Sequence, residues 1–337
     1  MLKTLAVLAL VATPLLGSTA AMAAEPKCEV DRPVVFAGLD WDSNSFHTAI
    51  ASFVLEHGYG CKTDKIPGST IPLLNGMARG DIDLTMEIWQ DNVKDAWEEA
   101  LEKDQVVDLG VNFPDAIQGW FVPKYLIEGD DAKAKGLKSV ADLPKFKDVF
   151  KDPEEPEKGR FYNCIAGWGC EVINTKKFGA YGLDDSYVNF KPGTGAALSA
   201  AILSNIKRKK PIVFYYWGPT SVLGKVSDQV TMLEEPAFDE AVWDKLSKED
   251  APKEACAYPI VPVIIGANKK FAESAPMIVA FLKNYETTNA MVSEALAFME
   301  DNGGDAEVAA KDFLTKNEDL WTKWVPEDVA GRVKAAL

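Results

Sequence analysis

The segment "LLNGMARGDIDLTMEIW" (73–89) contains a short helical pattern, a break, and an apolar strand that ends in a tryptophan. The segment "AILSNIKRKKPIVFYYW" (201–217) has the same order of features in the other half of the chain. The likeness is one of layout, not a detectable sequence repeat. It predicts two lobes that place equivalent groups at the ends of equivalent strands.

Apolar runs and amphipathic segments alternate through much of the chain, which is typical of α/β lobes with mainly parallel sheets flanked by helices. From residue 272 onward the pattern becomes mostly helical. Besides the two segments above, we predict strands at 32–41 and 160–167, and helices at 45–59, 170–182 and 193–210.

Two further stretches, 116–128 and 257–271, are interpreted as crossings between the lobes. We therefore predict that lobe 1 comprises residues 25–118 and 260–337, and that residues 119–259 form an inserted lobe 2. A ligand is expected in the cleft between them.

Residues 1–24 have the pattern of a secretory signal peptide. A single charge, Lys3, precedes the apolar run "LAVLALVATPLLG", and small residues lead to the expected cleavage point. The apolar run is too short for a membrane span, and no cysteine follows it as a site of lipidation. We expect a soluble mature protein that is exported across the inner membrane.

Composition argues against several classes of function. The formal net charge of −15 becomes about −16 once Lys3 is removed, and so acidic a chain repels nucleic acid. There is no GxSxG motif, phosphate loop or dinucleotide fingerprint, and both histidines lie in one helical segment. We predict a protein that is not an enzyme and has no cofactor. A secreted hydrolase or carbohydrate-binding protein remains a remote alternative.

The five cysteines are interpreted mainly as disulfides, the usual state of cysteine pairs in an exported protein. Pairing of Cys164 with Cys170 would close a small loop around a tryptophan. Cys28 and Cys61 precede the first two strands and could join neighbouring strand starts, which leaves Cys256 over. Because the chain has only two histidines and no CxxC pair, we predict no zinc site.

Four of the nine tryptophans follow one rule: Trp41, Trp89, Trp168 and Trp217 stand at or just beyond the ends of predicted strands. In open α/β sheets ligands bind in the crevice outside the carboxyl ends of the strands. We expect these rings to line a ligand site, with Trp120 on the crossing strand as a fifth. The remaining tryptophans are in helical segments and are predicted to be packing residues: Trp97, Trp243, Trp321 and Trp324.

Several indoles around one cavity attract a cation that donates no hydrogen bonds, because the ring faces carry negative potential. Each desolvated contact contributes about 0.5–2 kcal/mol, and quaternary ammonium groups are the usual guests. A stacked sugar is the competing guest. Sugar sites surround the ring with many polar side chains, and these strand ends supply few.

The order "GWGCE" (167–171) predicts a partner for a negative charge. A helix beginning near Cys170 would leave the backbone N–H groups of Gly169, Cys170 and Glu171 free to bind an anion. A disulfide would hold this loop in place before the ligand arrives, which lowers the ordering cost of binding. These features favour a zwitterion with a methylated cation and a carboxylate.

The motifs "GWGCEVIN", "KPIVFYYWGPT" and "DLTMEIW" resemble the periplasmic substrate-binding proteins of osmoprotectant ABC importers, the glycine betaine, proline betaine and choline-binding family. The resemblance covers essentially the whole chain after residue 24. It implies a periplasmic-binding-protein fold, closure of the lobes on the ligand, and a membrane permease as partner; we expect a monomer. It also implies a tryptophan box of Trp89, Trp168 and Trp217, with Trp41 fitting the choline-binding branch.

One departure from that family follows Trp89. The glycine betaine branch has a proline and a histidine soon after this tryptophan, whereas this chain reads "WQDNV". Gln90 or Asn92 would have to replace the missing contact to a carboxylate. Choline or trimethylamine N-oxide are therefore alternative ligands for the same cage, with Asp42, Asn44 or Glu87 near the polar end. These three residues fit caps or surface groups equally well.

Overall fold

The structure is a computed structural model that describes residues 26–337. The predicted signal peptide, residues 1–24, lies outside the described residues. Within 26–337, no helix is both long enough and apolar enough to cross a membrane.

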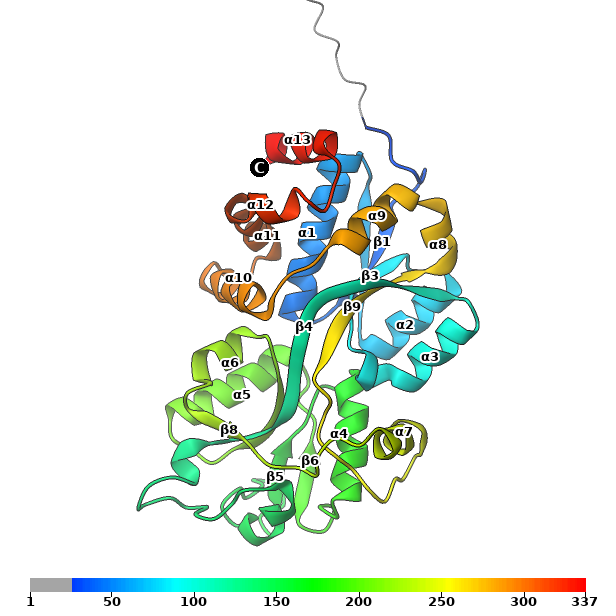
Figure 1. The fold of residues 1–337 in the computed structure, drawn as a ribbon. Coiled ribbons are helices and arrows are strands. Elements are labelled where there is room, and N and C mark those ends of the chain that lie inside the picture. The colour runs from blue at the N-terminus through cyan, green and yellow to red at the C-terminus, as the bar shows by residue number, and fades with distance from the viewer. Residues whose placement is uncertain (1–25) are drawn as a thin grey trace, which may run out of the picture.

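The strands follow one another in the order β2-β1-β3-β9-β4-β7-β5-β6, with β8 beside β4 (Figure 1). In the first half of the sheet, β1 pairs in parallel with both β2 and β3, and β9 runs antiparallel between β3 and β4. The strands of this half are β1 (Val34–Leu39), β2 (Thr63–Gly68), β3 (Leu84–Ile88) and β9 (Val261–Asn268).

The second half repeats this plan. Strand β5 pairs in parallel with β6 and β7, and β4 runs antiparallel to β7 and to β8. Its strands are β5 (Gly159–Tyr162), β6 (Tyr187–Phe190), β7 (Val213–Gly218) and β8 (Val230–Met232). Each half thus has three parallel strands next to antiparallel ones, so the sheet is mixed, and "mainly parallel" describes only its outer strands.

Strand β4 (Val106–Pro123) joins the two halves, as the long ribbon through the middle of Figure 1 shows. It pairs with β9 up to Ala116 and with β7 from Ile117 onward. The crossing strand therefore begins ten residues before the predicted 116–128. The change of partner lies two residues from the predicted boundary at 118/119; the division into lobes stays a prediction.

Helices cover the sheet on both sides (Figure 1). The helices packed around the first half are α1 (Asp42–Tyr59), α2 (Thr70–Arg79), α3 (Lys94–Glu102), α8 (Lys269–Ser274), α9 (Pro276–Asn284), α10 (Asn289–Asp301), α11 (Ala306–Lys316), α12 (Glu318–Trp321) and α13 (Glu327–Ala336). Those around the second half are α4 (Gly169–Ala180), α5 (Gly195–Lys207), α6 (Ser221–Val226) and α7 (Glu240–Lys248). Three short 3-10 helices complete the order: η1 (Gln90–Val93), η2 (Lys124–Leu126) and η3 (Val140–Phe146).

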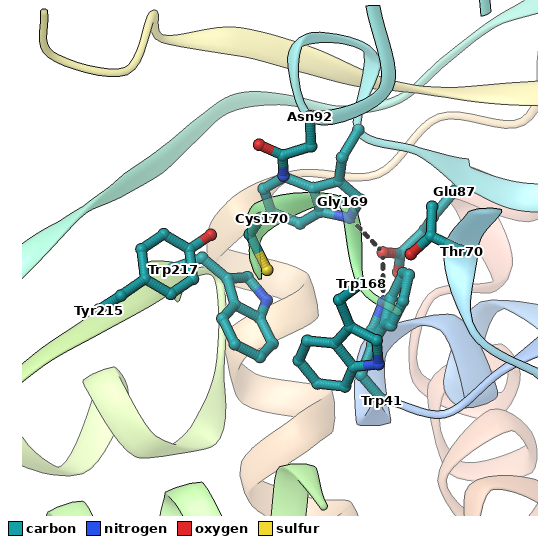
Figure 2. A pocket seen from close by; sticks show the side chains of 10 residues that line it. Trp41, Thr70, Glu87, Asn92, Trp168, Gly169, Cys170, Tyr215 and Trp217 are labelled. Atoms are coloured by element: carbon teal, nitrogen blue, oxygen red, sulfur yellow. Dashed lines mark hydrogen bonds between the residues drawn. The ribbon is translucent and has the colours of Figure 1, made fainter. Parts of the chain in front are cut away.

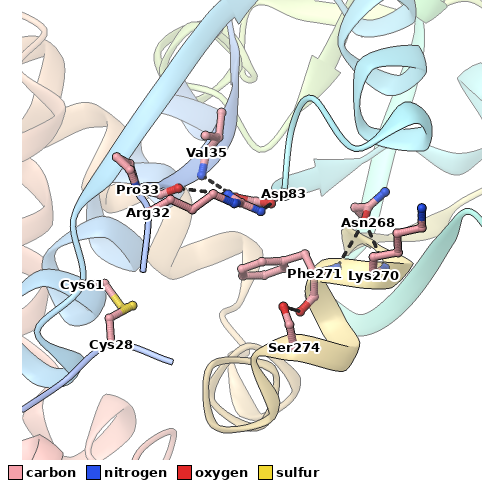
Figure 3. Close-up of polar contacts among 10 residues, drawn as sticks. All are labelled: Cys28, Arg32, Pro33, Val35, Cys61, Asp83, Asn268, Lys270, Phe271 and Ser274. Carbon is pink, nitrogen blue, oxygen red and sulfur yellow. Dashed lines mark hydrogen bonds and ion pairs between the residues drawn. A yellow bond between two sulfur atoms is a disulfide. The ribbon is translucent and has the colours of Figure 1, made fainter. Parts of the chain in front are cut away.

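Polar and covalent links fasten the start of the chain to the first half of the sheet (Figure 3). The guanidinium of Arg32 donates two hydrogen bonds, of 2.5 and 2.6 Å, to the buried carboxylate of Asp83. The same carboxylate accepts a 2.8 Å hydrogen bond from the backbone N–H of Val35 in β1. The predicted disulfide between Cys28 and Cys61 is present, with the sulfur atoms 2.03 Å apart.

The four tryptophans predicted to be packing residues are all buried: Trp97, Trp243, Trp321 and Trp324. The second predicted disulfide, Cys164–Cys170, is also present. In the part of the chain that the structure describes, Cys256 is left as a buried free thiol.

Candidate ligand-binding site

A cavity lies where the two halves of the sheet meet, and aromatic rings make up most of its wall (Figure 2). Residues from the first half of the sheet and its helices face residues from the second half across it. The lining residues are Trp41, Thr70, Glu87, Trp89, Asn92, Trp168, Gly169, Cys170, Tyr215 and Trp217.

Each of the four lining tryptophans lies at or next to the end of a helix or strand. Trp41 is the N-cap residue of α1, just after β1, and Trp89 directly follows β3. Trp168 is the N-cap residue of α4, and Trp217 is the penultimate residue of β7. The structure therefore brings together four of the five tryptophans that the sequence singles out.

Three of these rings, those of Trp41, Trp168 and Trp217, meet edge to face. The centroids of Trp41 and Trp168 are 5.3 Å apart with an angle of 72° between the planes. Those of Trp168 and Trp217 are 5.4 Å apart at 81°. Near-perpendicular neighbours act as adjoining walls of a box, so more than one indole face or edge borders the same small space.

Glu87, in β3, fixes two of the rings. Its Oε2 accepts a 2.8 Å hydrogen bond from the indole Nε1 of Trp41 and a 2.9 Å hydrogen bond from that of Trp89 (Figure 2). The residue is 1% exposed. Burial raises the pKa of Glu87, and the two indole donors partly offset that rise by stabilising the charged form.

The indole of Trp168 bonds to the opposite side of the junction. Its Nε1 donates a 2.6 Å hydrogen bond to Oδ1 of Asp40, the residue that directly follows β1. Asp40 belongs to the first half of the molecule and Trp168 to the second. This contact joins the two halves beside the cavity.

The start of α4 supplies backbone donors to the cavity. A helix gives no intrahelical acceptor to the N–H groups of its first residues, here Gly169 and Cys170. Glu171 departs from the expectation, because its N–H donates to the carbonyl of Trp168. Only glycine fits at 169: a Cβ there would lie 2.7 Å from the carbonyl oxygen of Asn92.

Trp120, the expected fifth ring, is not part of the cavity wall. It is fully buried, its ring stacks on Phe161 with centroids 3.9 Å apart, and its Nε1 donates a 2.7 Å hydrogen bond to Asn174. Strand β4 alternates its side chains between two faces, and position 120 points into the core of the second half. Its assignment as a ligand contact was wrong.

The polar candidates separate into two groups. Asn92 and Glu87 line the cavity, whereas Gln90, Asp42 and Asn44 do not. Asn44 is buried within α1 and accepts a 3.2 Å hydrogen bond from the N–H of Leu39. Asp42 is exposed, at the first position of α1, where a carboxylate suits the helix dipole.

Three residues at or behind the cavity were not predicted from the sequence. Tyr215 and Thr70 line the cavity, and Gln118 lies behind it, where its Oε1 accepts hydrogen bonds from Tyr215 (2.6 Å) and Asn92 (2.8 Å). Tyr215 could have been predicted, because it is two residues before Trp217 in β7 and therefore lies on the same face of the strand.

Two α/β halves with an aromatic cavity at their junction define a solute-binding protein of the two-lobed type. The chain belongs to the family described as the substrate-binding domain of ABC-type glycine betaine transport systems, whose model matches residues 32–316. The predicted resemblance and fold class are thereby confirmed. The members of this family are substrate-binding transport proteins.

Relatives of known description differ in ligand. The glycine betaine/proline betaine-binding periplasmic protein of Escherichia coli is 27% identical over 264 residues, 76% of this chain and 78% of that protein. The trimethylamine N-oxide-binding protein of Pelagibacter ubique is 22% identical over 293 residues, 86% and 90% of the two chains. A choline-binding protein of an ABC transporter, solved with choline, has the same fold: TM-score 0.72, 20% identity, 90% and 97% coverage.

Proposed function

We propose that this protein is a periplasmic solute-binding protein that captures a small N-methylated compatible solute, of the glycine betaine type or alternatively choline or trimethylamine N-oxide, and delivers it to the membrane permease of an ABC importer. The observation that carries the proposal is the set of four tryptophans, from two halves of the molecule, around one cavity. Family membership supports the delivery step.

The chemistry of the cavity suits a methylated nitrogen. Indole faces attract its positive charge, at about 0.5–2 kcal/mol for each desolvated contact. The N-methyl groups need no hydrogen-bond acceptor, so placing them against aromatic walls leaves no polar group unpaired. The amides of Gly169 and Cys170 would receive an anionic end if the ligand carries one.

The two halves of the box support binding by closure. In the proposed lobes, Trp41 and Trp89 belong to residues 25–118 plus 260–337, and Trp168 and Trp217 to residues 119–259. A ligand that contacts all four rings binds best when the lobes are together, which couples occupancy to the shape that a permease receives. We expect the monomer to be the active unit.

Calorimetric titration with glycine betaine, choline, trimethylamine N-oxide and a sugar panel tests the proposal. We expect an N-methylated ligand to bind, and Trp168→Ala and Trp217→Ala each to weaken its binding more than about tenfold. The control is Trp324→Phe, a buried position away from the cavity. Unchanged affinity in both cavity variants, or binding of sugars alone, would refute the cage.

A further inference from the structure

Glu87 is an acidic group whose second oxygen has no partner. Oε2 is engaged by Trp41 and Trp89, whereas the buried Oε1 accepts no hydrogen bond from any residue within 26–337. An unpaired buried carboxylate oxygen costs free energy that a bound partner removes. Because the residue lines the cavity, that partner can be the ligand.

The charged residues around the cavity indicate which net charge the ligand should carry. Among its lining residues in the described chain, Glu87 is the only acidic one, and there is no lysine, arginine or histidine. A ligand with a net positive charge therefore makes the site electrically neutral when Glu87 is ionised. A zwitterion such as glycine betaine brings its own carboxylate and leaves Glu87 without a counter-charge.

We propose that ionised Glu87 is the counter-ion of the ligand, and that the protein consequently prefers a net-cationic N-methylated ligand of the choline class to a zwitterion. The hydroxyl of such a ligand would donate to Oε1 while its methylated nitrogen occupies the box. This inference rests on the proposed function and assigns the chemical class of ligand within it.

Ser43 offers a competing partner. Its hydroxyl is near enough to Glu87 to stabilise the charged carboxylate, yet Ser43 Oγ makes no hydrogen bond within the described residues. Both groups thus have unused hydrogen-bonding capacity, but of the two only Glu87 lines the cavity. If the Ser43 hydroxyl donates the missing hydrogen bond to Glu87, the choice of ligand should depend on Ser43 as much as on Glu87.

The test compares the wild type with Glu87→Gln by calorimetry, using choline, tetramethylammonium, glycine betaine and trimethylamine N-oxide. Glutamine keeps the shape and an acceptor oxygen but removes the charge. We expect the wild type to bind choline at least tenfold more tightly than glycine betaine. Glu87→Gln should weaken choline and tetramethylammonium at least tenfold, while glycine betaine binds as before or better.

Two outcomes would overturn the inference while leaving the proposed function standing. In the first, the wild type prefers glycine betaine and Glu87→Gln weakens all ligands equally, so that Glu87 only positions Trp41 and Trp89. In the second, the N-oxide binds best and Glu87→Gln preserves it, so that Glu87 acts as a neutral donor. If no N-methylated ligand binds the folded wild type, the proposed function itself fails.

The variant Ser43→Ala is the matched control. It removes the hydroxyl beside Glu87 but keeps the carboxylate and every residue that lines the cavity, so the order of the four ligands should stay that of the wild type. A reversal of that order in Ser43→Ala would assign the discrimination to the hydroxyl instead. Thermal unfolding of each variant, followed by circular dichroism, establishes that the compared proteins are folded.

Discussion

At the scale of single residues, Lys177 is a cation enclosed in the core of the second half. Its Nζ is 2.7 Å from Oε1 of Glu235, and the two side chains are 0% and 2% exposed. The ammonium also lies 4.1 Å from the ring centroid of Tyr258. Burial lowers the pKa of Lys177, and the attraction of Glu235 opposes that change. Each charge here depends on the other.

Lys177→Met should lower the free energy of unfolding by about 3–5 kcal/mol, because it leaves the carboxylate of Glu235 buried and uncompensated. The double variant Lys177→Met/Glu235→Met should regain most of that loss, since it removes both charges and keeps side-chain volume. Urea unfolding of the wild type and both variants at pH 7.5 measures the difference. A double variant less stable than the single one would contradict this account.

His47 is the residue that ties folding stability to mild acid. It is fully buried in α1, and its Nδ1 is 2.7 Å from the hydroxyl of Tyr285. Burial lowers the pKa of His47 to about 3, against about 6.5 in the unfolded chain. Below pH 6.5 the unfolded chain therefore binds a proton that the folded protein does not, and stability falls as the pH falls.

The size of this effect follows from the pKa difference. Between pH 7 and pH 5 the wild type should lose about 2 kcal/mol more than His47→Asn, at about 1.36 kcal/mol for each pH unit below 6.5. Acidic groups common to both proteins cancel in the difference. Urea unfolding at the two pH values provides the measurement, and equal losses in the two proteins would show that His47 becomes protonated without unfolding.

At the scale of elements, the two disulfides have different roles. Cys28–Cys61 closes a separation of 33 residues at the edge of the first half, away from the cavity. Cys164–Cys170 closes a separation of 6 residues at the start of α4, and Cys170 itself lines the cavity. The longer closure constrains the unfolded chain more, whereas the shorter one holds the binding loop.

We expect the double variant Cys28→Ser/Cys61→Ser to lose about 4 kcal/mol of stability, and Cys164→Ser/Cys170→Ser about 2 kcal/mol, from the chain-entropy relation. Ligand affinity should show the opposite order. It should fall about threefold to tenfold when the loop before α4 must be ordered on binding, and stay unchanged in the other variant. Calorimetry and urea unfolding of the two variants test both orders; an equal change in affinity would contradict the division.

The elements also show how far the sequence alone could go. Strand ends were predictable, because hydrophobic runs end where the chain leaves the sheet, and four tryptophans at those ends do meet in one cavity. The position of the Trp120 side chain was not predictable, because it depends on which face of β4 the residue occupies and on its hydrogen bond to Asn174, 54 residues away. The pairing of Glu87 with Trp41 likewise depends on the register between β1 and β3, which no local pattern encodes.

At the scale of the whole molecule, contacts between the halves lie at different depths, and two of them show the contrast. The hydrogen bond from Trp168 to Asp40 is beside the cavity and joins a ring of the box to the opposite half. The ion pair between Lys94 in α3 and Asp244 in α7 is 3.4 Å long and lies nearer the surface, with side chains 22% and 42% exposed. Both join the proposed lobes, but only the first also orients a ligand-contacting ring.

Asp40→Ala should therefore weaken ligand binding about fivefold, because the lost hydrogen bond contributes about 1 kcal/mol to the closed arrangement. Asp40→Asn keeps an acceptor for the indole N–H and should lose less. Asp244→Ala is the control for bridging alone, and as a surface pair it should change affinity less than about twofold. Calorimetry gives the affinities, and X-ray scattering with and without ligand should show the compact form less populated in Asp40→Ala. If Asp244→Ala weakens binding as much as Asp40→Ala, bridging in general stabilises closure, and the bond to Trp168 has no special part in it.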